Sequence, residues 1–312
     1  MLRTASRAID GIDDLRHLVH GSQVDLVQLD PGRLRGEIRH VSSAQFGLSI
    51  GSFSHGVRGR GVFGSHQATI GLALSSSGPM SQWAYKCHPD DLIVCPPGSD
   101  HESSYRGPVT ICTLSLSPDM LANHFANEGS LQDQDYWHRI RRIHIDPQRA
   151  EHMRQSLSQI VSLLMAPHKQ RFDPDYVRRA AAEAFGLAFL HAGTADSREP
   201  ILAAAKIVRQ AEDFVEGTGF RAVHVSELCA ALNVTRRSLH RAFSETLGIG
   251  PIAYLRQRRL SAIHSALRRS DPSATTVMDV AAEHGFSEFG RFAAYYRQLF
   301  DEYPAQTLRR MR

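Results

Sequence analysis

The sequence predicts an α+β fold: an amino-terminal β domain, a pair of helices and a carboxy-terminal all-helical domain. Three observations predict it. Short segments of alternating polarity fill residues 24–116, and apolar residues follow a helical period after Pro118. A pattern that begins at Leu228 is repeated from Val280, which indicates one structural unit used twice. The length of 312 residues suits two domains of ordinary size.

The β domain is predicted within residues 1–145. Its segments alternate apolar and polar residues, and glycine, proline, serine and Asn/Asp separate them roughly every 8 to 12 residues. The clearest are RLRGEIRHV, QFGLSIGSF, QATIGLAL, DLIVCPPG and VTICTLSL. Side chains alternate between the two faces of a strand, so this pattern is typical of sheets with one buried face. We therefore expect a sandwich or a small barrel.

Two amphipathic helices are predicted in residues 146–195. Met153, Leu157 and Val161 share one face of the first helix, and Val177 and Phe185 share one face of the second. Such a pair either packs on the β domain or pairs with a second copy of the chain, and the sequence leaves both open. The small, polar stretch HAGTADSREP, residues 191–200, is the candidate linker.

Charge separates the two ends of the chain. Residues 196–312, the predicted helical domain, hold 17 Lys and Arg against 13 Asp and Glu, whereas residues 1–195 hold 19 of each kind. The whole formal excess of +4 therefore belongs to the carboxy-terminal part. A basic domain beside a neutral one predicts a polyanionic partner for the basic domain.

Several classes of protein are disfavoured by composition. No apolar run approaches the ~18 residues of a membrane span, and the first residues lack the apolar core of a signal peptide. We expect a cytoplasmic protein without a membrane partner. The four cysteines lie far apart without C-x-x-C spacing, which favours reduced, mostly buried thiols over disulfides or a zinc site.

The repeated unit has the pattern of a helix-turn-helix. A first helix is followed by a turn, an apolar plug and a second helix with a hydroxyl residue as N-cap. In the two copies the turn residues are Asn233 and Gly285, the plugs are Val234 and Phe286, and the N-caps are Thr235 and Ser287. Glycine adopts positive φ at the bend without a steric penalty. In such motifs the second helix enters the major groove of DNA.

The second helix of the first unit is predicted to present cations outward. Leu239, Ala242 and Phe243 have the spacing of its core face. The positions that remain for the outer face are Arg236, Arg237, His240 and Arg241. Arginine can contact guanine O6 and N7 with two hydrogen bonds, whereas cations on phosphates add affinity without sequence preference. A solvated basic face is the alternative.

A helix over residues 251–268 is predicted to connect the two units. Its length is about 27 Å at 1.5 Å per residue, which could hold two recognition helices near the roughly 34 Å between successive major grooves. Arg256, Arg258 and Arg259 are expected to meet phosphates, with a surface charge run as the alternative. The second unit offers Ser287, Glu288 and Arg291, so we expect weaker base recognition there. The candidate DNA-binding residues are Thr235, Arg236, Arg237, His240, Arg241, Arg256, Arg258, Ser287, Glu288 and Arg291.

Residues 200–312 resemble the double helix-turn-helix domain of the AraC/XylS family of bacterial transcription regulators. The stretches VAAEHGFSEFGRFAAYYRQLF and YPAQTLRR carry the resemblance most specifically. Asp301 departs from the family, which usually has glycine there, and a positive φ at this position would cost some local stability. The resemblance implies a regulator that binds promoter DNA, with RNA polymerase and a second copy of the chain as further partners.

The resemblance also implies a cupin-like barrel that binds an effector or dimerises. PPGSDH, residues 96–101, resembles one cupin metal motif, but the H-x-H partner is missing, because His55 and His66 stand alone. We therefore expect His101 to be a turn or core histidine and expect no metal. A metal-dependent cupin oxygenase with a DNA-binding tail is the enzymatic alternative, and an architectural DNA-binding protein without effector is another. No catalytic motif is found, which favours a protein that is not an enzyme.

Arginines of the β domain are the candidate effector-binding residues. They are Arg33, Arg35, Arg39, Arg58 and Arg60. Alternation would place the first three on one face of a strand, where guanidinium groups could hold an anion through paired hydrogen bonds. The expected effector is a small anion: a carboxylate, a phosphate metabolite or a cyclic dinucleotide. Solvated strand charges are the alternative.

Overall fold

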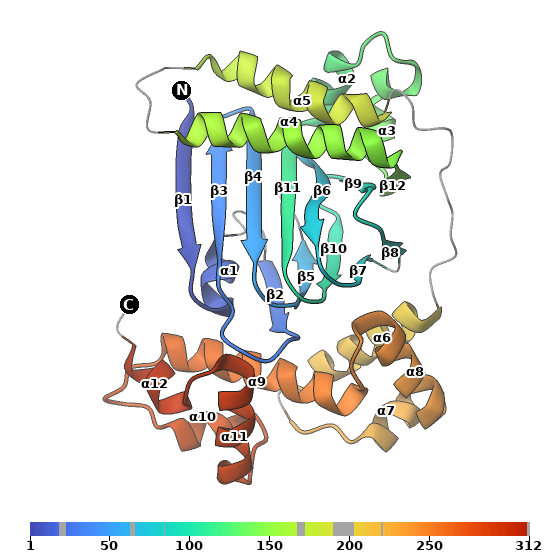
Figure 1. Ribbon diagram of the computed structural model, residues 1–312. Helices are drawn as coiled ribbons and strands as arrows, with labels where there is room; N and C mark the ends of the chain where they lie inside the picture. Colours follow the sequence, from blue (N-terminus) through green and yellow to red (C-terminus); the bar gives the residue numbers. More distant parts are fainter. Residues whose placement is uncertain are drawn as a thin grey trace.

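The computed structural model describes residues 1–310 except residues 19–22, 63–65, 84, 167–171, 190–202 and 220. A β-rich amino-terminal domain lies above a helical carboxy-terminal domain in Figure 1, which confirms the predicted α+β class. The candidate linker at residues 191–200 lies outside the described residues.

Two antiparallel sheets form the amino-terminal domain. The first has seven strands in the spatial order β1 (Arg3–Ile9), β3 (Gly36–Ser42), β4 (Phe46–Phe53), β11 (Val109–Leu116), β6 (Ala68–Ser76), β9 (Asp91–Cys95) and β12 (Arg141–His144). The second has five strands in the order β2 (Gln23–Gln28), β5 (Val57–Val62), β10 (Asp100–Tyr105), β7 (Met80–Gln82) and β8 (Tyr85–Cys87). The inner faces of both sheets line one cavity, as expected for a cupin-like barrel.

Alternation along the strands separates the two faces of the seven-stranded sheet. In β4, Leu48 and Ile50 are buried in the core that the sheet shares with the helices outside it. The intervening Ser49 and Gly51 face the interior of the barrel. The outer face of the sheet is therefore apolar, whereas its inner face carries small and polar residues together with some apolar ones such as Phe53.

Helices cover the outer face of this sheet. They are α4 (Pro147–Met165) and α5 (Pro174–Phe189), with α2 (Pro118–His124), the 3-10 helix η1 (Gly129–Gln132) and α3 (Gln134–Trp137) beside them. Asp146 caps α4 by accepting hydrogen bonds from the backbone N–H groups of Gln148 and Arg149. Leu157 of α4 and Phe185 of α5 are fully buried in the core shared with the sheet. Of the two uses predicted for the helical pair, the apolar faces serve packing within one chain.

The carboxy-terminal domain consists of two helical units joined by a long helix. Its helices are α6 (Ala203–Gly217), α7 (Val225–Ala231), α8 (Arg236–Leu247), α9 (Pro251–Arg269), α10 (Val277–Glu283), α11 (Phe289–Phe300) and α12 (Pro304–Arg309). The connector α9 confirms the predicted helix and is about 28 Å long. Among the helices that the structure describes, none has the length and apolar character needed to cross a lipid bilayer.

The barrel packs on both units of the helical domain. Leu26 and Tyr105 of the barrel share a buried apolar cluster with Ile263 of α9 and Tyr296 of α11. A second cluster joins β2 and the residues after it to α6, α7 and α8. Figure 1 shows α9 passing beneath the barrel with one unit near each of its ends. The connector α9 thus contacts the barrel as well as both helical units.

Candidate functional site

The first helical unit has the helix-turn-helix geometry that the sequence predicts. Asn233 adopts positive φ (52°) at the turn, and the Thr235 hydroxyl accepts a hydrogen bond of 3.0 Å from the backbone N–H of Ser238 as the N-cap of α8. Leu239 and Phe243 are fully buried. These contacts fix the turn and determine which face of α8 is left outward.

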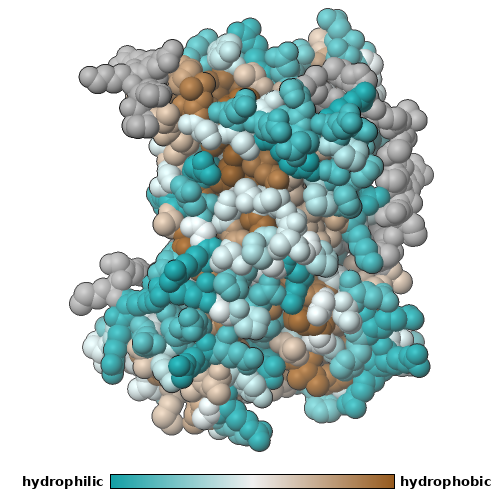
Figure 2. Space-filling view, viewed as in Figure 1, coloured by the Kyte–Doolittle hydropathy of each residue, from teal (hydrophilic) through white to brown (hydrophobic). Residues whose placement is uncertain are grey.

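The outward face of α8 is basic. The side chains expected there, Arg236, Arg237, His240 and Arg241, are exposed. Arg241 lies 3.8 Å from Glu245 one turn along the helix, with 72% of its side chain exposed, so this pair holds it weakly. Within the described part of the chain, no acidic group forms an ion pair with Arg236 or Arg237. Figure 2 shows hydrophilic residues over much of the helical half of the displayed face.

The second unit keeps the turn but changes the start of its second helix. Gly285 adopts positive φ (75°), as predicted. The N-cap of α11 is Glu288, whose side chain makes no capping hydrogen bond, so the prediction that Ser287 caps this helix is wrong. The helix begins at Phe289, one residue too late for the Ser287 hydroxyl to cap it. Glu288 also forms an exposed ion pair of 3.0 Å with Arg291.

The connector arginines take three different environments. Arg256 stacks over the Tyr295 ring at 4.0 Å. Arg259 donates a hydrogen bond to the carbonyl of Gly285 and lies over Phe286. Arg258, expected to contact phosphate, instead lies between the domains, 3.8 Å from a carboxylate oxygen of Asp25 on β2 and of Glu216 on α6. Because these carboxylates hold its guanidinium between the barrel and α6, Arg258 does not lie on the outer face of the helical domain where DNA would bind.

The five arginines proposed to bind an effector do not converge on one site. Strand β3 begins at Gly36, so the predicted placement of Arg33 and Arg35 on a strand face with Arg39 is wrong. Arg33 forms an ion pair with Asp10, and Arg39 lies 3.6 Å from Glu37. Arg35 is exposed ahead of the strand. The remaining two belong to the other sheet, and their guanidinium groups contact carboxylates.

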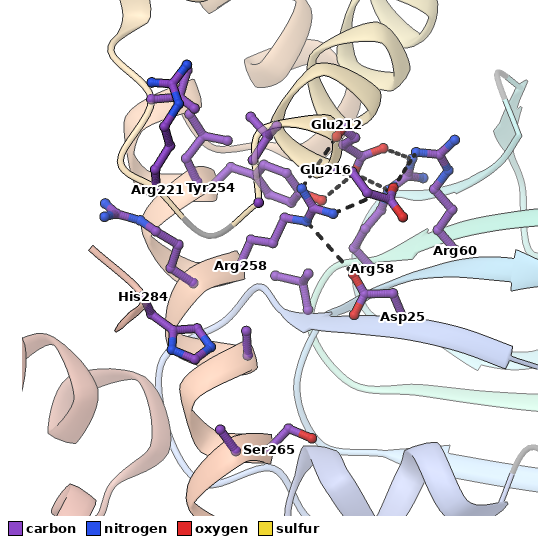
Figure 3. Close-up of a pocket in the computed structure, with 18 of the residues that line it drawn as sticks. Asp25, Arg58, Arg60, Glu212, Glu216, Arg221, Tyr254, Arg258, Ser265 and His284 are labelled. Carbon is purple, nitrogen blue, oxygen red and sulfur yellow. Dashed lines mark hydrogen bonds and ion pairs between the residues drawn. The ribbon is translucent and has the colours of Figure 1, made fainter. Parts of the chain in front are cut away.

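Those two arginines form an interdomain network with the helical domain. The network consists of Arg58, Arg60, Glu102, Arg209, Glu212, Asp213 and Tyr254. Arg58 contacts Glu212 of α6 with two hydrogen bonds, of 2.8 and 3.1 Å, and Glu102 of β10 with one of 3.1 Å. Tyr254 of α9 donates to the same Glu212 carboxylate. Figure 3 shows Arg58, Glu212 and Tyr254 of this network meeting between the strands of the barrel and the helices.

Burial makes this network electrostatically strong. The Arg58 and Glu212 side chains are only 3% and 4% exposed. Burial opposes the charge of Arg58, but Glu212 and Glu102 outweigh that effect and raise the pKa of the guanidinium. Burial would likewise raise the pKa of Glu212, yet Arg58 lowers it overall. Both groups therefore remain charged, and each depends on the other because little water reaches them.

Arg60 extends the network toward an interdomain cleft. Its guanidinium lies 2.5 Å from Asp213, and Glu102 also pairs with Arg209 of α6 at 2.6 Å. The cleft has a volume of about 850 Å³ and is lined by strands β2 and β5 together with α6 and α9. Arg258 and Arg259 lie among its lining residues. The boundary between the domains is thus rich in charged groups of both signs.

A second cavity, of about 450 Å³, lies inside the barrel. The inner face of the seven-stranded sheet contributes hydroxyl groups and glycines, including Ser49, Thr69, Gly71, Thr113 and Ser115. Apolar side chains, including Leu26, Ile38, Phe53 and Ile111, form another part of its wall. A volume of this size lies within the range of small-molecule pockets. The barrel is therefore hollow, with a wall of mixed polarity.

Strands β5 and β10 connect this cavity to the interdomain network. Gly59 of β5 and Ser103 of β10 line the cavity. The neighbours of Gly59 and Ser103 along each strand point to the opposite face of the sheet. There Arg58, Arg60 and Glu102 meet α6. One strand pair thus touches the interior of the barrel on one side and the helical domain on the other.

His101 is buried at the start of β10, as expected for a core histidine. Its ring lies edge-on to Trp83, with ring centroids 5.8 Å apart. Burial and the nearby charge of Arg58 lower its pKa to about 3, so the ring is neutral at pH 7. Among the described residues, no group of three or more His, Cys, Asp or Glu side chains could hold a metal ion.

Sequence reasoning missed the helical partners of the network. Glu212 has the spacing of the buried face of α6, between Val208 and Val215. A carboxylate among apolar residues at that spacing was a signal for a buried ion pair. Its partner, Arg58, lies 154 residues away, and no local pattern could have identified that pairing.

Comparison with known proteins assigns a family model to part of the helical domain. Residues 228–310 match a family model described as a helix-turn-helix domain. A probable thc operon regulatory protein of Rhodococcus erythropolis is 34% identical over 111 residues, covering 36% of this chain and 33% of that protein. A XylDLEGF operon transcriptional activator of Pseudomonas putida is 32% identical over 95 residues, covering 30% of this chain and 60% of that protein. The chain thus spans from about a third to about three fifths of these relatives' lengths.

One solved structure is matched over nearly its whole length. It is a probable AraC family transcriptional regulator from Rhodopseudomonas palustris, with 36% identity and a TM-score of 0.30. The similarity spans 33% of this chain and 94% of that chain. Residues 228–310, which match the family model, contain both turns, both recognition helices and the connector between them. On the sequence similarity to these regulators and on the observed pair of helix-turn-helix units, residues 228–310 form a helix-turn-helix domain of the AraC/XylS type.

Proposed function

We propose that this protein is a sequence-specific transcription regulator that binds promoter DNA and responds to a small molecule bound in its barrel. The observation that carries the proposal is the exposed basic face of α8, held outward by the buried Leu239 and Phe243. Arg237 lies on this face without an acidic partner among the described residues. Such a face on the second helix of a helix-turn-helix suits the major groove.

Control by an effector is supported by the hollow barrel and by the strands that border it. A ligand that displaces the inner faces of β5 and β10 would act on the interdomain network through the outer faces of the same strands. The network binds α6, which packs on α8 in the first helix-turn-helix unit. Besides promoter DNA, we propose RNA polymerase and a second copy of the chain as partners, and the cytoplasm as the place of action.

Arg237→Ala tests the DNA-binding part of the proposal. A preferred duplex is first selected from a pool of random sequences, and the affinities of the full chain for that duplex and for a scrambled one are then compared at one salt concentration. We expect the variant to lose about 1 to 3 kcal/mol on the selected duplex and much less on the scrambled one, because it loses a base contact.

Arg139→Ala is the matched control, because it removes the same charge from an exposed position of the amino-terminal domain, between α3 and β12. It should leave both affinities unchanged. Equal losses of Arg237→Ala on both duplexes would make Arg237 a phosphate contact only. Absence of any preferred duplex would refute the proposed function.

A further inference from the structure

The cavity of the barrel contains no cationic side chain among its described lining residues. Neither lysine nor arginine contributes to its wall, and every arginine of the barrel expected to bind an anion lies elsewhere. An anion in this cavity would lose its hydration without gaining a guanidinium or ammonium counter-charge, which is unfavourable. The cavity therefore disfavours the anionic effectors that the arginine-rich sequence suggested.

Asp91, the one carboxylate among the described lining residues of the cavity, already has hydrogen-bond and ion-pair partners within the protein. Asp91 accepts a hydrogen bond of 2.7 Å from the backbone N–H of His88 and lies 2.8 Å from Nδ1 of His144 and 3.8 Å from Arg142. With these neighbours it has little capacity to balance a cationic ligand.

Of the three histidines among the described lining residues, His101 is neutral. Nδ1 of His40 lies 2.7 Å from the Ser49 hydroxyl, and Nδ1 of His88 lies 3.3 Å from Asp90. The wall as a whole thus favours a ligand without charge.

One wall residue is left in need of a hydrogen-bond donor. Gln82 donates from Nε2 to the Tyr105 hydroxyl at 2.6 Å, while its buried Oε1 accepts no hydrogen bond from the described residues. Buried acceptors without donors are uncommon in folded proteins. This atom has almost no accessible surface, so a hydroxyl or N–H group of a ligand would satisfy Oε1 only after the Gln82 amide turns it toward the cavity, whereas a carboxylate has no proton to donate.

The rest of the wall divides between hydroxyl groups and hydrocarbon. Thr69 and Ser115 hydrogen-bond each other at 2.9 Å, and these hydroxyl groups keep lone pairs that can accept from a ligand. Ile38, Phe53 and Ile111 offer an apolar surface to the same cavity. A ligand that satisfies the whole wall needs a polar head and an apolar body.

From these observations we propose that the effector is an uncharged molecule with an apolar body and a hydrogen-bond-donating head such as an alcohol, bound inside the barrel. The inference rests on the proposed function, because it names the ligand class of the cavity through which control is exerted. It replaces the anionic effector with a neutral one, since the arginines that suggested an anion lie outside the cavity and four of the five are paired with acidic residues of the protein.

Gly71 provides a way to fill the cavity without disturbing the backbone. A Cβ atom at this position would lie 3.7 Å from Cγ2 of Thr113 and 3.9 Å from the carbonyl oxygen of Cys112, which are ordinary contact distances. Leucine at this position would therefore extend into the cavity. Gly71→Ala is the matched control, because it adds the Cβ and little more.

The test titrates the full chain with matched probes by calorimetry. Two skeletons are used, each with three head groups: octanol, octanoate and octylamine, and phenylethanol, phenylacetate and phenethylamine. We expect at least one alcohol to bind about tenfold or more tightly than its carboxylate and its amine. Gly71→Leu should weaken that binding by about tenfold or more, and Gly71→Ala should retain it.

Each other outcome contradicts the proposal. Carboxylates or amines that bind as tightly as the alcohols would show that the site accepts charge, and binding that survives Gly71→Leu would lie outside the cavity. Failure of both alcohols to bind would refute the ligand class. If Gly71→Leu does not fold, Thr113→Leu fills the same space from the neighbouring strand. The affinity for the selected duplex, measured without probe, separates these failures from failure of the proposed function.

Discussion

Arg58 is the residue on which the contact between the two domains most depends. Its guanidinium bridges Glu102 of the barrel and Glu212 of the helical domain, with nearly all of the side chain buried. In such a position the attraction within the ion pair is offset by the loss of water around both charges. Removing one partner alone is therefore far more costly than removing both.

We expect Arg58→Met to lower the free energy of unfolding by about 3 to 5 kcal/mol, because Glu212 is left buried without its cation. The double variant Arg58→Met/Glu212→Leu should recover much of that loss, since no isolated charge remains. Urea denaturation of the full chain measures both.

Arg39→Met is the control for this prediction. Arg39 also lies on a strand of the barrel but forms only an exposed pair with Glu37, so its removal should cost less than about 1 kcal/mol. A loss for Arg58→Met as small as that of Arg39→Met would contradict the role given to the network.

At the residue scale, local chemistry was predictable and long-range pairing was not. Thr235 was identified as an N-cap and Gly285 as a positive-φ residue because each role depends on neighbours in sequence. Arg258 was misplaced because its environment is set by Asp25 and Glu216, which are distant in the chain. Charge alone did not reveal which arginines face solvent.

At the scale of elements, the second helices of the two helix-turn-helix units end in the same backbone conformation but at different residues. Helix α8 ends at Gly248 with φ of 69°, and α11 ends at Asp301 with φ of 55°, so both C-caps are left-handed. A residue with a Cβ atom is strained in this conformation, although aspartate tolerates it better than most. The departure of Asp301 from the family pattern therefore has a local cost.

We expect Asp301→Gly to raise the free energy of unfolding by about 1 kcal/mol, because glycine adopts this φ without strain. The reciprocal change Gly248→Asp in the first unit should lower it by a similar amount, as a Cβ there meets only ordinary contacts with Arg106. Thermal unfolding of the two variants measures the effect. Destabilisation by Asp301→Gly would indicate that the aspartate side chain stabilises the cap.

Elements with one buried face were predictable from the sequence. The alternation of β4 and β11 and the apolar spacing of α4 and α9 follow from the cores on which they pack. Strand β1 was missed because it lies at the edge of its sheet with nearly all of its residues exposed, so it lacks the apolar alternation that identifies a strand. The division of one arginine-rich segment, residues 33–60, between two sheets was also beyond local patterns.

At the scale of the whole molecule, the barrel contacts the second helical unit through a buried histidine. His264 of α9 lies between Asp13 of α1 (Ile12–Leu18) and Glu302 after α11, with Nε2 3.3 Å from the latter carboxylate. Burial would lower the pKa of His264, but hydrogen bonds and charge from both carboxylates raise it above the ordinary 6.5. The ring thus joins Asp13 of the amino-terminal domain to Glu302 of the second unit.

This geometry predicts a stability that falls at alkaline pH. Because the folded pKa of His264 is raised, its contribution is fully present below the unfolded value of 6.5 and is lost as the pH rises through the folded value. We expect the melting temperature of the wild-type chain to fall over that interval, and that of His264→Gln to fall less. Parallel curves for the two proteins would exclude His264 as the source.

The two-sided character of β5 and β10 has a consequence for how such a protein can change over time. Under the proposed function, residues that face the lumen can be exchanged to accommodate a different effector, while the alternate positions, with Arg58 and Glu102, keep their contacts with α6. An insertion or deletion within either strand would exchange the two sets, since a shift of one residue reverses every side chain. Point substitutions could therefore change the preferred ligand of the cavity. A change in strand length would instead disrupt both the cavity wall and the contacts with the helical domain.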